Sequence, residues 1–184
     1  MFLLEVDEQI TLKILHLSDA EELFLLTDRS REYLREWLPW VDATKTVDDS
    51  RGFIQHARKQ YAERKGLACG IFYQGCLAGT VAFNSFDWLN RIGYIGYWLA
   101  PYHQGKGIMT RACQSLIHHA FYILELNKID IRAAYENKKS RAIPERLGFM
   151  KEGQIRQAEW LYDHYVDHVV YGLLAREWKE KHSL

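Results

Sequence analysis

The pattern of hydrophobic and polar positions along the chain predicts alternating strands and helices. Strands are predicted where apolar residues alternate with polar ones, or form short runs between turn residues. These segments are residues 9–15, 67–73, 76–83, 92–99, 128–135, 149–161 and 165–174. Helices are predicted where apolar residues recur every three or four positions. These segments are residues 18–28, 31–37, 46–65, 109–126 and 140–147.

Turn and capping residues mark where the predicted helices begin and end. Ser18 opens a capping-box sequence at the start of the helix at 18–28. Pro39 ends the short helix at 31–37. Gly66, Asn127 and Gly148 each follow a helical pattern, where residues that tolerate a left-handed backbone commonly end a helix. On the helix at 46–65, one apolar face is expected to pack against the domain: Val47, Phe53, Ile54, Ala57 and Tyr61.

The order of the elements predicts an α/β fold with a mixed sheet. Gln74-Gly75 joins two strands by a tight turn, so these strands are antiparallel neighbours. The strand at 92–99, the helix at 109–126 and the strand at 128–135 form a parallel crossover unit, which is right-handed. We therefore expect a single central mixed sheet flanked by helices on both faces.

Composition and charge narrow the class of protein. The length of 184 residues predicts a single domain over residues 1–184, and 48% hydrophobic with 26% charged residues is typical of a globular protein; the family resemblance described below implies a core from about 10 to 175. Basic and acidic residues both number 24, so no net charge draws the chain to nucleic acid or to a membrane. Three cysteines without a CxxC pair, and an N-terminus unlike a signal peptide, favour a reducing cytoplasm.

Glycine residues mark the segment that carries the candidate chemistry. Gly93 and Gly96 interrupt the strand at 92–99, which is typical of a β-bulge or a close backbone approach, and residues 84–90 before it are expected to form a loop. Residues 97–110 then run from this strand through a glycine-rich turn into a helix. Such a junction directs unpaired backbone N–H groups, at the positive end of the helix dipole, toward a bound anion.

Two common phosphate-binding patterns do not fit this turn. In a P-loop, Lys106 would be followed by serine or threonine and Ala100 would be glycine, but Gly107 follows the lysine. A dinucleotide fingerprint would place its third glycine where Thr110 stands.

The turn instead resembles the pyrophosphate loop of the GNAT acyl-CoA N-acyltransferase superfamily. The loop pattern Gln/Arg-x-x-Gly-x-Gly/Ala is matched by Gln104 and Gly107, while Met109 replaces the usual small residue and Gly105 adds a second permissive position. Residues 136–140, 145–149 and 151–153 are similar to the stretch that follows the fifth strand in this family. Residues 94–99, 107–109 and 157–161 resemble the branch of ribosomal-protein N-terminal acetyltransferases, RimJ and above all RimL.

The resemblance implies an enzyme that transfers acetyl from acetyl-CoA to an N-terminal α-amine of a protein, in particular a ribosomal protein, by direct attack in a ternary complex. It implies two alternatives: acetylation of a small amine such as a polyamine or an antibiotic, or a silent acyl-CoA-binding module. The high aromatic content, 14%, is compatible with a homo-oligomer, with a dimer favoured. No metal is expected, because His164 and His168 fall in a strand pair rather than on one helical face.

The resemblance also assigns the site residues. Glu159 takes the position of the general base; the alternative is a salt bridge on a strand. Ser140 takes the position of the hydrogen-bond donor to the leaving thiolate; the alternative is a helix cap. A backbone N–H near the end of the strand at 92–99 is expected to stabilise the developing oxyanion. Trp37, Trp40 and Trp88 are candidates for the acceptor groove, or for packing. The expected cofactor-binding residues are Tyr97, Trp98, Leu99, Gln104, Gly105, Lys106, Gly107, Ile108, Met109, Thr110 and Asn137.

Overall fold

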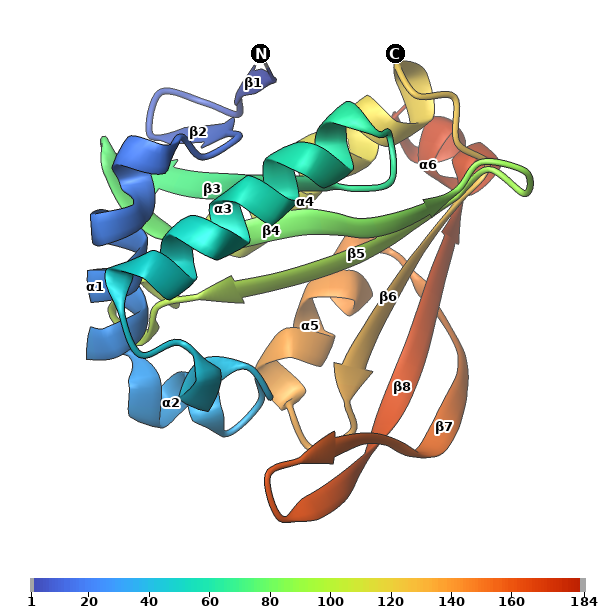
Figure 1. The fold of residues 1–184 in the computed structure, drawn as a ribbon. Helices are drawn as coiled ribbons and strands as arrows, with labels where there is room; N and C mark the ends of the chain where they lie inside the picture. The colour runs from blue at the N-terminus through green and yellow to red at the C-terminus, as the bar shows by residue number, and fades with distance from the viewer. Residues whose placement is uncertain (1, 183–184) are drawn as a thin grey trace.

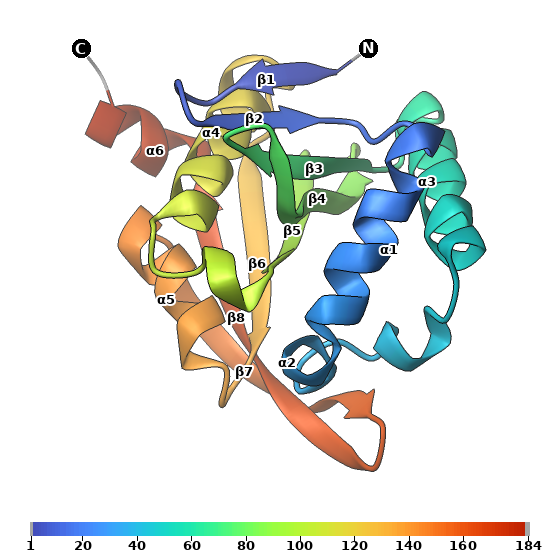
Figure 2. The same cartoon turned by 90° about the vertical axis from the view of Figure 1, so that its left-hand side faces the viewer.

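A computed structural model describes residues 2–182, which form one eight-stranded mixed sheet with helices on both faces (Figures 1 and 2). The strand order is β1-β2-β3-β4-β5-β6-β8-β7. The strands are β1 (Leu3–Glu5), β2 (Ile10–Lys13), β3 (Leu67–Tyr73), β4 (Cys76–Asp87), β5 (Ile92–Leu99), β6 (Lys128–Ala134), β7 (Met150–Leu161) and β8 (His164–Leu174). The helices are α1 (Ala20–Arg29), α2 (Arg31–Arg35), α3 (Val47–Ala62), α4 (Ile108–Tyr122), α5 (Lys138–Leu147) and α6 (Ala175–His182), with short 3-10 turns η1 (Leu17–Asp19), η2 (Val41–Ala43) and η3 (Pro101–His103).

The predicted strands and helices are all present, and so is the parallel crossover from β5 through α4 to β6. Among the apolar residues that recur every three or four positions from 109 to 124, Ala112, Cys113 and Leu116 are buried and join the main core, whereas Ile123, just past the end of α4, is 67% exposed. The periodicity did not reveal β1, which has only three residues, or α6, which is strongly polar. Among the described residues, no helix is both long enough and apolar enough to cross a membrane.

Three predicted helix boundaries were wrong. At the start of α1, the Asp19 carboxylate accepts the backbone N–H of His16 at 2.7 Å, so Ser18 is not the capping residue. After α3 the left-handed residue is Arg64, with φ of 56°, while Gly66 has a close approach to the Phe83 carbonyl instead. Helix α4 ends at Tyr122, before the expected Asn127. Gly148 does end α5, with φ of 85°.

A split between β5 and β6 is the feature that prepares the site. Only Ile92–Ile95 of β5 pair with β6, and residues 96–99 diverge from it, as Figure 1 shows. The backbone edge of those four residues therefore faces an opening rather than a neighbouring strand. Figure 1 also shows α5 lying beside this opening.

The bulge predicted around the glycines of β5 lies in the neighbouring strand β4. The β4–β5 register shifts between Phe83 and Ser85, which leaves Asn84 without a partner and bends the strand. Gly96 lies close to the bulge, and a Cβ atom there would lie 2.5 Å from the Asn84 amide nitrogen. Glycine at 96 therefore allows the close approach. The expected loop at 84–90 was wrong in its first part, since β4 continues to Asp87.

Candidate active site

The glycine-rich turn between β5 and α4 forms a cradle of backbone groups. Gly105 and Gly107 both adopt left-handed conformations, with φ of 76° and 69°. Gly107 is the N-cap of the 15-residue helix α4, and no side chain caps that helix end. A Cβ atom added at either glycine would meet nothing within 4 Å. The space beside the N-terminus of α4 is therefore open, as an anion site at a helix N-terminus requires.

This cradle opens into a cavity of about 1730 Å³ that also takes in the free edge of β5. The cavity reaches from the loop before α4 to the wall formed by α3 and the α2–α3 connection, and to the β7–β8 pair. Most of the residues expected at the site line it: Trp37, Trp40, Tyr97, Trp98, Leu99, Gln104, Gly105, Gly107, Ile108, Met109, Thr110, Asn137, Ser140 and Glu159.

The structure places two of the expected residues elsewhere. Trp88 lies at the far end of the β4–β5 hairpin, where its indole N–H donates to the Arg64 carbonyl at 2.6 Å. It is not among the residues lining the cavity, so the acceptor-groove role does not apply to it. The Lys106 ammonium lies over the Tyr73 ring, 5.5 Å from its centre, and does not line the cavity either.

Positive charge at the cradle comes from α5 instead of Lys106. The Lys139 ammonium donates to the Gln104 side chain at 3.3 Å, and the Arg146 guanidinium donates to the Thr110 hydroxyl at 3.1 Å. Both basic side chains therefore reach across from α5 to the loop and the first turn of α4. They place cations where a bound pyrophosphate would carry negative charge.

The start of α5 shows which residue caps this helix. The helix is capped by Asn137, whose side-chain oxygen accepts the Ser140 backbone N–H at 3.1 Å. The expectation that Ser140 itself caps the helix was therefore wrong. The Ser140 carbonyl accepts the Tyr97 hydroxyl at 2.8 Å, and burial raises the pKa of Tyr97, so this donor stays protonated. The contact ties α5 to the free end of β5.

Glu159 lies on the opposite wall of the cavity, on β7. Its carboxylate oxygen Oε2 is 3.0 Å from Nε2 of His168 on β8, and the two side chains are 28% and 19% exposed. The partner of Glu159 is thus a histidine and not a lysine or arginine. His168 also lines the cavity, a position that the sequence pattern did not predict. Its contact with Glu159 depends on the register of the two strands, which periodicity does not specify.

An irregular turn in β7 positions Glu159. Ile155 pairs with His168 and Glu159 with Val166, so three residues of β7 stand opposite the single residue Asp167 of β8 and two of them are extra. Gln157 within this bulge has φ of 48°, and its N–H donates to the Asp167 carboxylate at 2.8 Å. The Gln154 amide donates to the other oxygen of the same carboxylate at 2.8 Å. Asp167 therefore holds the bulge from the neighbouring strand.

The hold of Asp167 on the bulge is expected to depend on pH. The Gln157 N–H, followed by the Gln154 amide, lowers the pKa of the Asp167 carboxyl below its value of about 3.9 in an unfolded chain. The stabilisation is therefore complete above about pH 5 and is lost as the pH falls through the lowered pKa. We expect Asp167→Asn to be less stable than the parent in urea unfolding at pH 7, with the difference shrinking below about pH 4. A constant difference down to pH 3 would contradict this.

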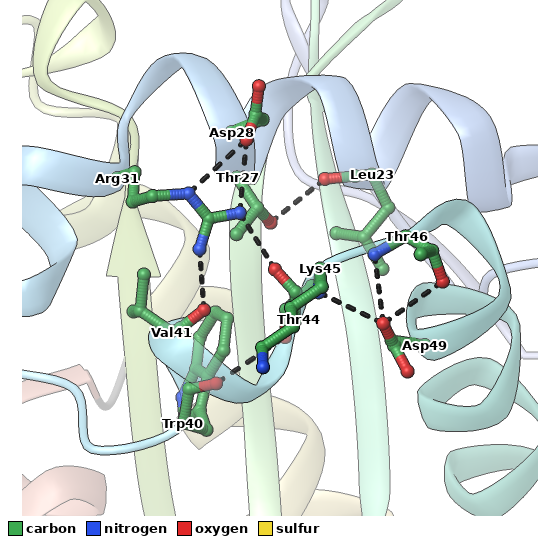
Figure 3. Close-up of polar contacts among 10 residues, drawn as sticks. All are labelled: Leu23, Thr27, Asp28, Arg31, Trp40, Val41, Thr44, Lys45, Thr46 and Asp49. Atoms are coloured by element: carbon green, nitrogen blue, oxygen red, sulfur yellow. Dashed lines mark hydrogen bonds and ion pairs between the residues drawn. The ribbon is translucent and has the colours of Figure 1, made fainter.

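The α2–α3 connection, which brings Trp37 and Trp40 to the cavity, is held in place by Arg31 (Figure 3). The Arg31 guanidinium donates to the Val41 and Thr44 carbonyls, each at 2.7 Å, and to the Asp28 carboxylate at 3.0 Å. These bonds tie both ends of η2 to the end of α1. Trp40 precedes this turn, and its ring lies 6.0 Å from that of Trp98 on β5.

Removing this guanidinium should loosen the wall. We expect Arg31→Met to lower the free energy of unfolding by about 2 kcal/mol, because two charge-assisted hydrogen bonds to the backbone are lost. Denaturant unfolding followed by tryptophan fluorescence measures the change. Arg29→Met is the matched control, since it removes the same charge from an exposed position of α1. Equal stability of the two variants would contradict the role of Arg31.

The same wall is joined to the β7–β8 turn. The Tyr162 hydroxyl donates to the Leu38 carbonyl at 2.5 Å, and the Arg35 guanidinium lies 3.8 Å from the centre of the Tyr162 ring. Arg35 is itself paired with Asp42 at 2.9 Å. Burial raises the pKa of Tyr162, so its hydroxyl remains a donor. The β7–β8 turn is thus joined to α2 and to the segment that follows it.

The apolar face of α3 was expected to pack against the domain, but only part of it does. Of its predicted apolar face only Ile54 is buried, whereas Phe53 is 45% exposed and lines the cavity together with Ala57. Part of this apolar face is therefore a wall of the site and not part of the core.

Comparison with known proteins agrees with this geometry. The family model described as "Acetyltransferase (GNAT) domain" matches residues 9–150. The "Putative ribosomal N-acetyltransferase YdaF" of Bacillus subtilis is 42% identical over 97% of this chain and 98% of its own length. The "Ribosomal-protein-serine acetyltransferase" of Escherichia coli is 32% identical over 89% and 92%.

A solved structure shares the whole architecture. The structure described as RimL, a ribosomal L7/L12 alpha-N-protein acetyltransferase in complex with coenzyme A, has a TM-score of 0.92 and 27% identity, covering 96% of this chain and 99% of that one. The likeness covers nearly the whole of both chains. The chain belongs to the GNAT family of acetyltransferases, enzymes that take their acetyl group from acetyl-CoA.

Proposed function

We propose that this acetyltransferase acts on the N-terminal α-amine of a protein, in particular a ribosomal protein, by direct attack in a ternary complex. The observation that carries the proposal is the position of the Glu159 carboxylate, which lines the same cavity as the cradle at Gly105–Thr110. The names of the relatives that match nearly the whole chain support a ribosomal protein as acceptor.

The residues of the cavity fit acetyl-CoA. The α4 N–H groups at the cradle would hold the pyrophosphate, with Lys139 and Arg146 adding positive charge. The backbone edge of residues 96–99, which has no strand partner on its β6 side, would hydrogen-bond the pantetheine arm. When bound, this cofactor supplies an acetyl thioester, an activated acyl group with a thiolate as leaving group.

The protonation state of the acceptor favours an α-amine. An amine attacks only when it is neutral, and an α-amine of pKa 7.7–8.0 is on the order of 10% neutral at pH 7, against under about 0.1% for a lysine. Glu159 accepts the proton that the amine gives up, directly or through a water molecule. Its position on the cavity wall opposite α5 suits this role.

Groups of α5 and β5 stabilise the negative charge that develops on the leaving thiolate and on the acetyl oxygen. Ser140 is the third residue of α5, and since Asn137 provides the cap, the Ser140 hydroxyl is available to donate to the leaving thiolate. The positive end of the α5 dipole favours negative charge at the same place. A backbone N–H near Leu99, at the free end of β5, stabilises the developing oxyanion.

The carboxylates of the cavity favour a singly charged acceptor over a polyamine. Of the three that line it, Asp49 accepts the backbone N–H groups of Lys45 and Thr46, and Asp48 pairs with Arg51. Glu159 is left to face the acceptor. A polycation would require several unpaired carboxylates along its length.

Intact mass spectrometry tests the proposed substrate class. The protein is incubated with acetyl-CoA and, separately, ribosomal proteins, synthetic N-terminal peptides and a pool of small amines including spermidine. We expect a single acetyl group at the N-terminus of one protein or of its peptide. Acetylation confined to small amines would overturn the protein-acceptor proposal, and binding of acetyl-CoA without any product would favour a silent binding module.

The solution state of the protein rests on sequence arguments. The aromatic content favours a homodimer, and the three cysteines, free in the structure, are compatible with a reducing cytoplasm. Both stay predictions, and sedimentation velocity measures the first.

A further inference from the structure

We propose that His168 is a positioning residue for acetyl transfer. It donates its Nε2 proton to Oε2 of Glu159 and so fixes the carboxylate with Oε1 directed at the proton of the acceptor amine. The inference rests on the proposed function, in which Glu159 is the base. It adds a residue to the reaction that family motifs did not point to.

The geometry that supports this role is specific to the β7–β8 pair. Oε2 of Glu159 and Nε2 of His168 are 3.0 Å apart, within hydrogen-bond distance. Glu159 pairs with Val166, and His168 lies two positions further along β8, so its side chain is on the same face and diagonal to Glu159. Both side chains are mostly covered and both line the cavity.

The chemistry of the two groups defines the direction of the hydrogen bond. A carboxylate only accepts hydrogen bonds, so the imidazole must carry a proton on Nε2. The neutral tautomer with this proton leaves Nδ1 bare and adds no charge to the cavity. A glutamate side chain has three rotatable torsions, and the hydrogen bond restrains them. The second oxygen stays free to accept a proton.

The bulge held by Asp167 serves the same contact. Without the two extra residues of β7, a different side chain would stand diagonal to His168. The Gln157 N–H and the Gln154 amide fasten the bulge to the Asp167 carboxylate, directly next to His168 in sequence. Strand β8 therefore supplies both the anchor of the bulge and the donor to the carboxylate that the bulge presents.

A matched pair of variants tests the role of His168. His168→Gln keeps an amide donor close to the place of Nε2, whereas His168→Met has a side chain of similar volume and no donor. We expect His168→Met to lower kcat by about tenfold, with the KM for acetyl-CoA unchanged, since the base would be present but less well oriented. His168→Gln should recover most of this loss, to within about threefold of the parent.

Further variants separate this inference from the proposed function. In a Glu159→Gln background, His168→Met should have little additional effect on kcat, since the residue acts through Glu159. His164→Met, on the same strand but outside the cavity lining, controls for loss of a histidine. Equal kcat for the Met and Gln variants, or a full effect of His168→Met without Glu159, would overturn the positioning role alone. Full activity of Glu159→Gln itself would overturn the base and thereby the proposed mechanism.

Discussion

Glu159→Gln is expected to lower kcat by about 10²- to 10⁴-fold at neutral pH, the usual contribution of a general base. Glutamine has the same shape and still accepts the hydrogen bond from His168, but it cannot take a proton from the amine. The cradle is formed by the turn before α4 and not by β7, so the KM for acetyl-CoA should not change. Steady-state kinetics across pH 6–9, with acceptor and acetyl-CoA varied separately, measures both parameters.

The control for this substitution lies on the same strand. Glu152→Gln removes a carboxylate from β7 that pairs with Lys128 at 2.7 Å and does not line the cavity. It should leave kcat unchanged. If Glu159→Gln retained full turnover at every pH, Glu159 would be only the strand ion pair that the sequence left open as an alternative.

Gly107→Ala is expected to weaken the binding of coenzyme A by about 100-fold. The Cβ atom would enter the open space over the cradle, where the pyrophosphate is proposed to lie. Loss of a hydrogen bond to a charged group costs up to about 3 kcal/mol, which corresponds to about two orders of magnitude in Kd. Isothermal titration calorimetry with coenzyme A measures the affinity without requiring an acceptor.

Strain must be separated from loss of the cradle, since φ at Gly107 is 69°. A side chain in a left-handed conformation costs about 1–2 kcal/mol of stability. Gly75→Ala is a matched control, because Gly75 has φ of 83°, meets nothing within 4 Å, and lies in the β3–β4 turn outside the cavity lining. Both variants should lose similar stability in thermal unfolding. If both also bound coenzyme A equally well, the cradle would not be the pyrophosphate site.

Local sequence patterns were sufficient for much of the molecule. The inward face of α4 is buried as its periodicity predicted, because a helix repeats every 3.6 residues whatever it packs against. The cradle at Gly105 and Gly107 was also predictable, since left-handed backbone at a helix start is a local property of glycine. Family resemblance added Glu159 and Ser140, and both line the cavity.

Local sequence patterns did not predict the role of residues that depend on a partner far away in the chain. Trp88 and Trp40 are both tryptophans near predicted boundaries, yet Trp88 contacts Arg64 and Trp40 lines the cavity. Phe53 belongs to an apolar helical face but borders the site. An apolar residue satisfies the same periodicity whether it meets a core or a substrate, so the pattern does not distinguish them.

The sequence by itself determined the order of all strands and helices except β1 and α6, the parallel crossover and the glycine-rich turn before α4, because each follows from residues close together in the chain. The tertiary structure alone decided that Asn137 and not Ser140 caps α5, and that His168 meets Glu159. The last contact joins two strands through a bulge of three residues. Strand register is a property of the pair, and a shift of one residue would turn His168 to the other face.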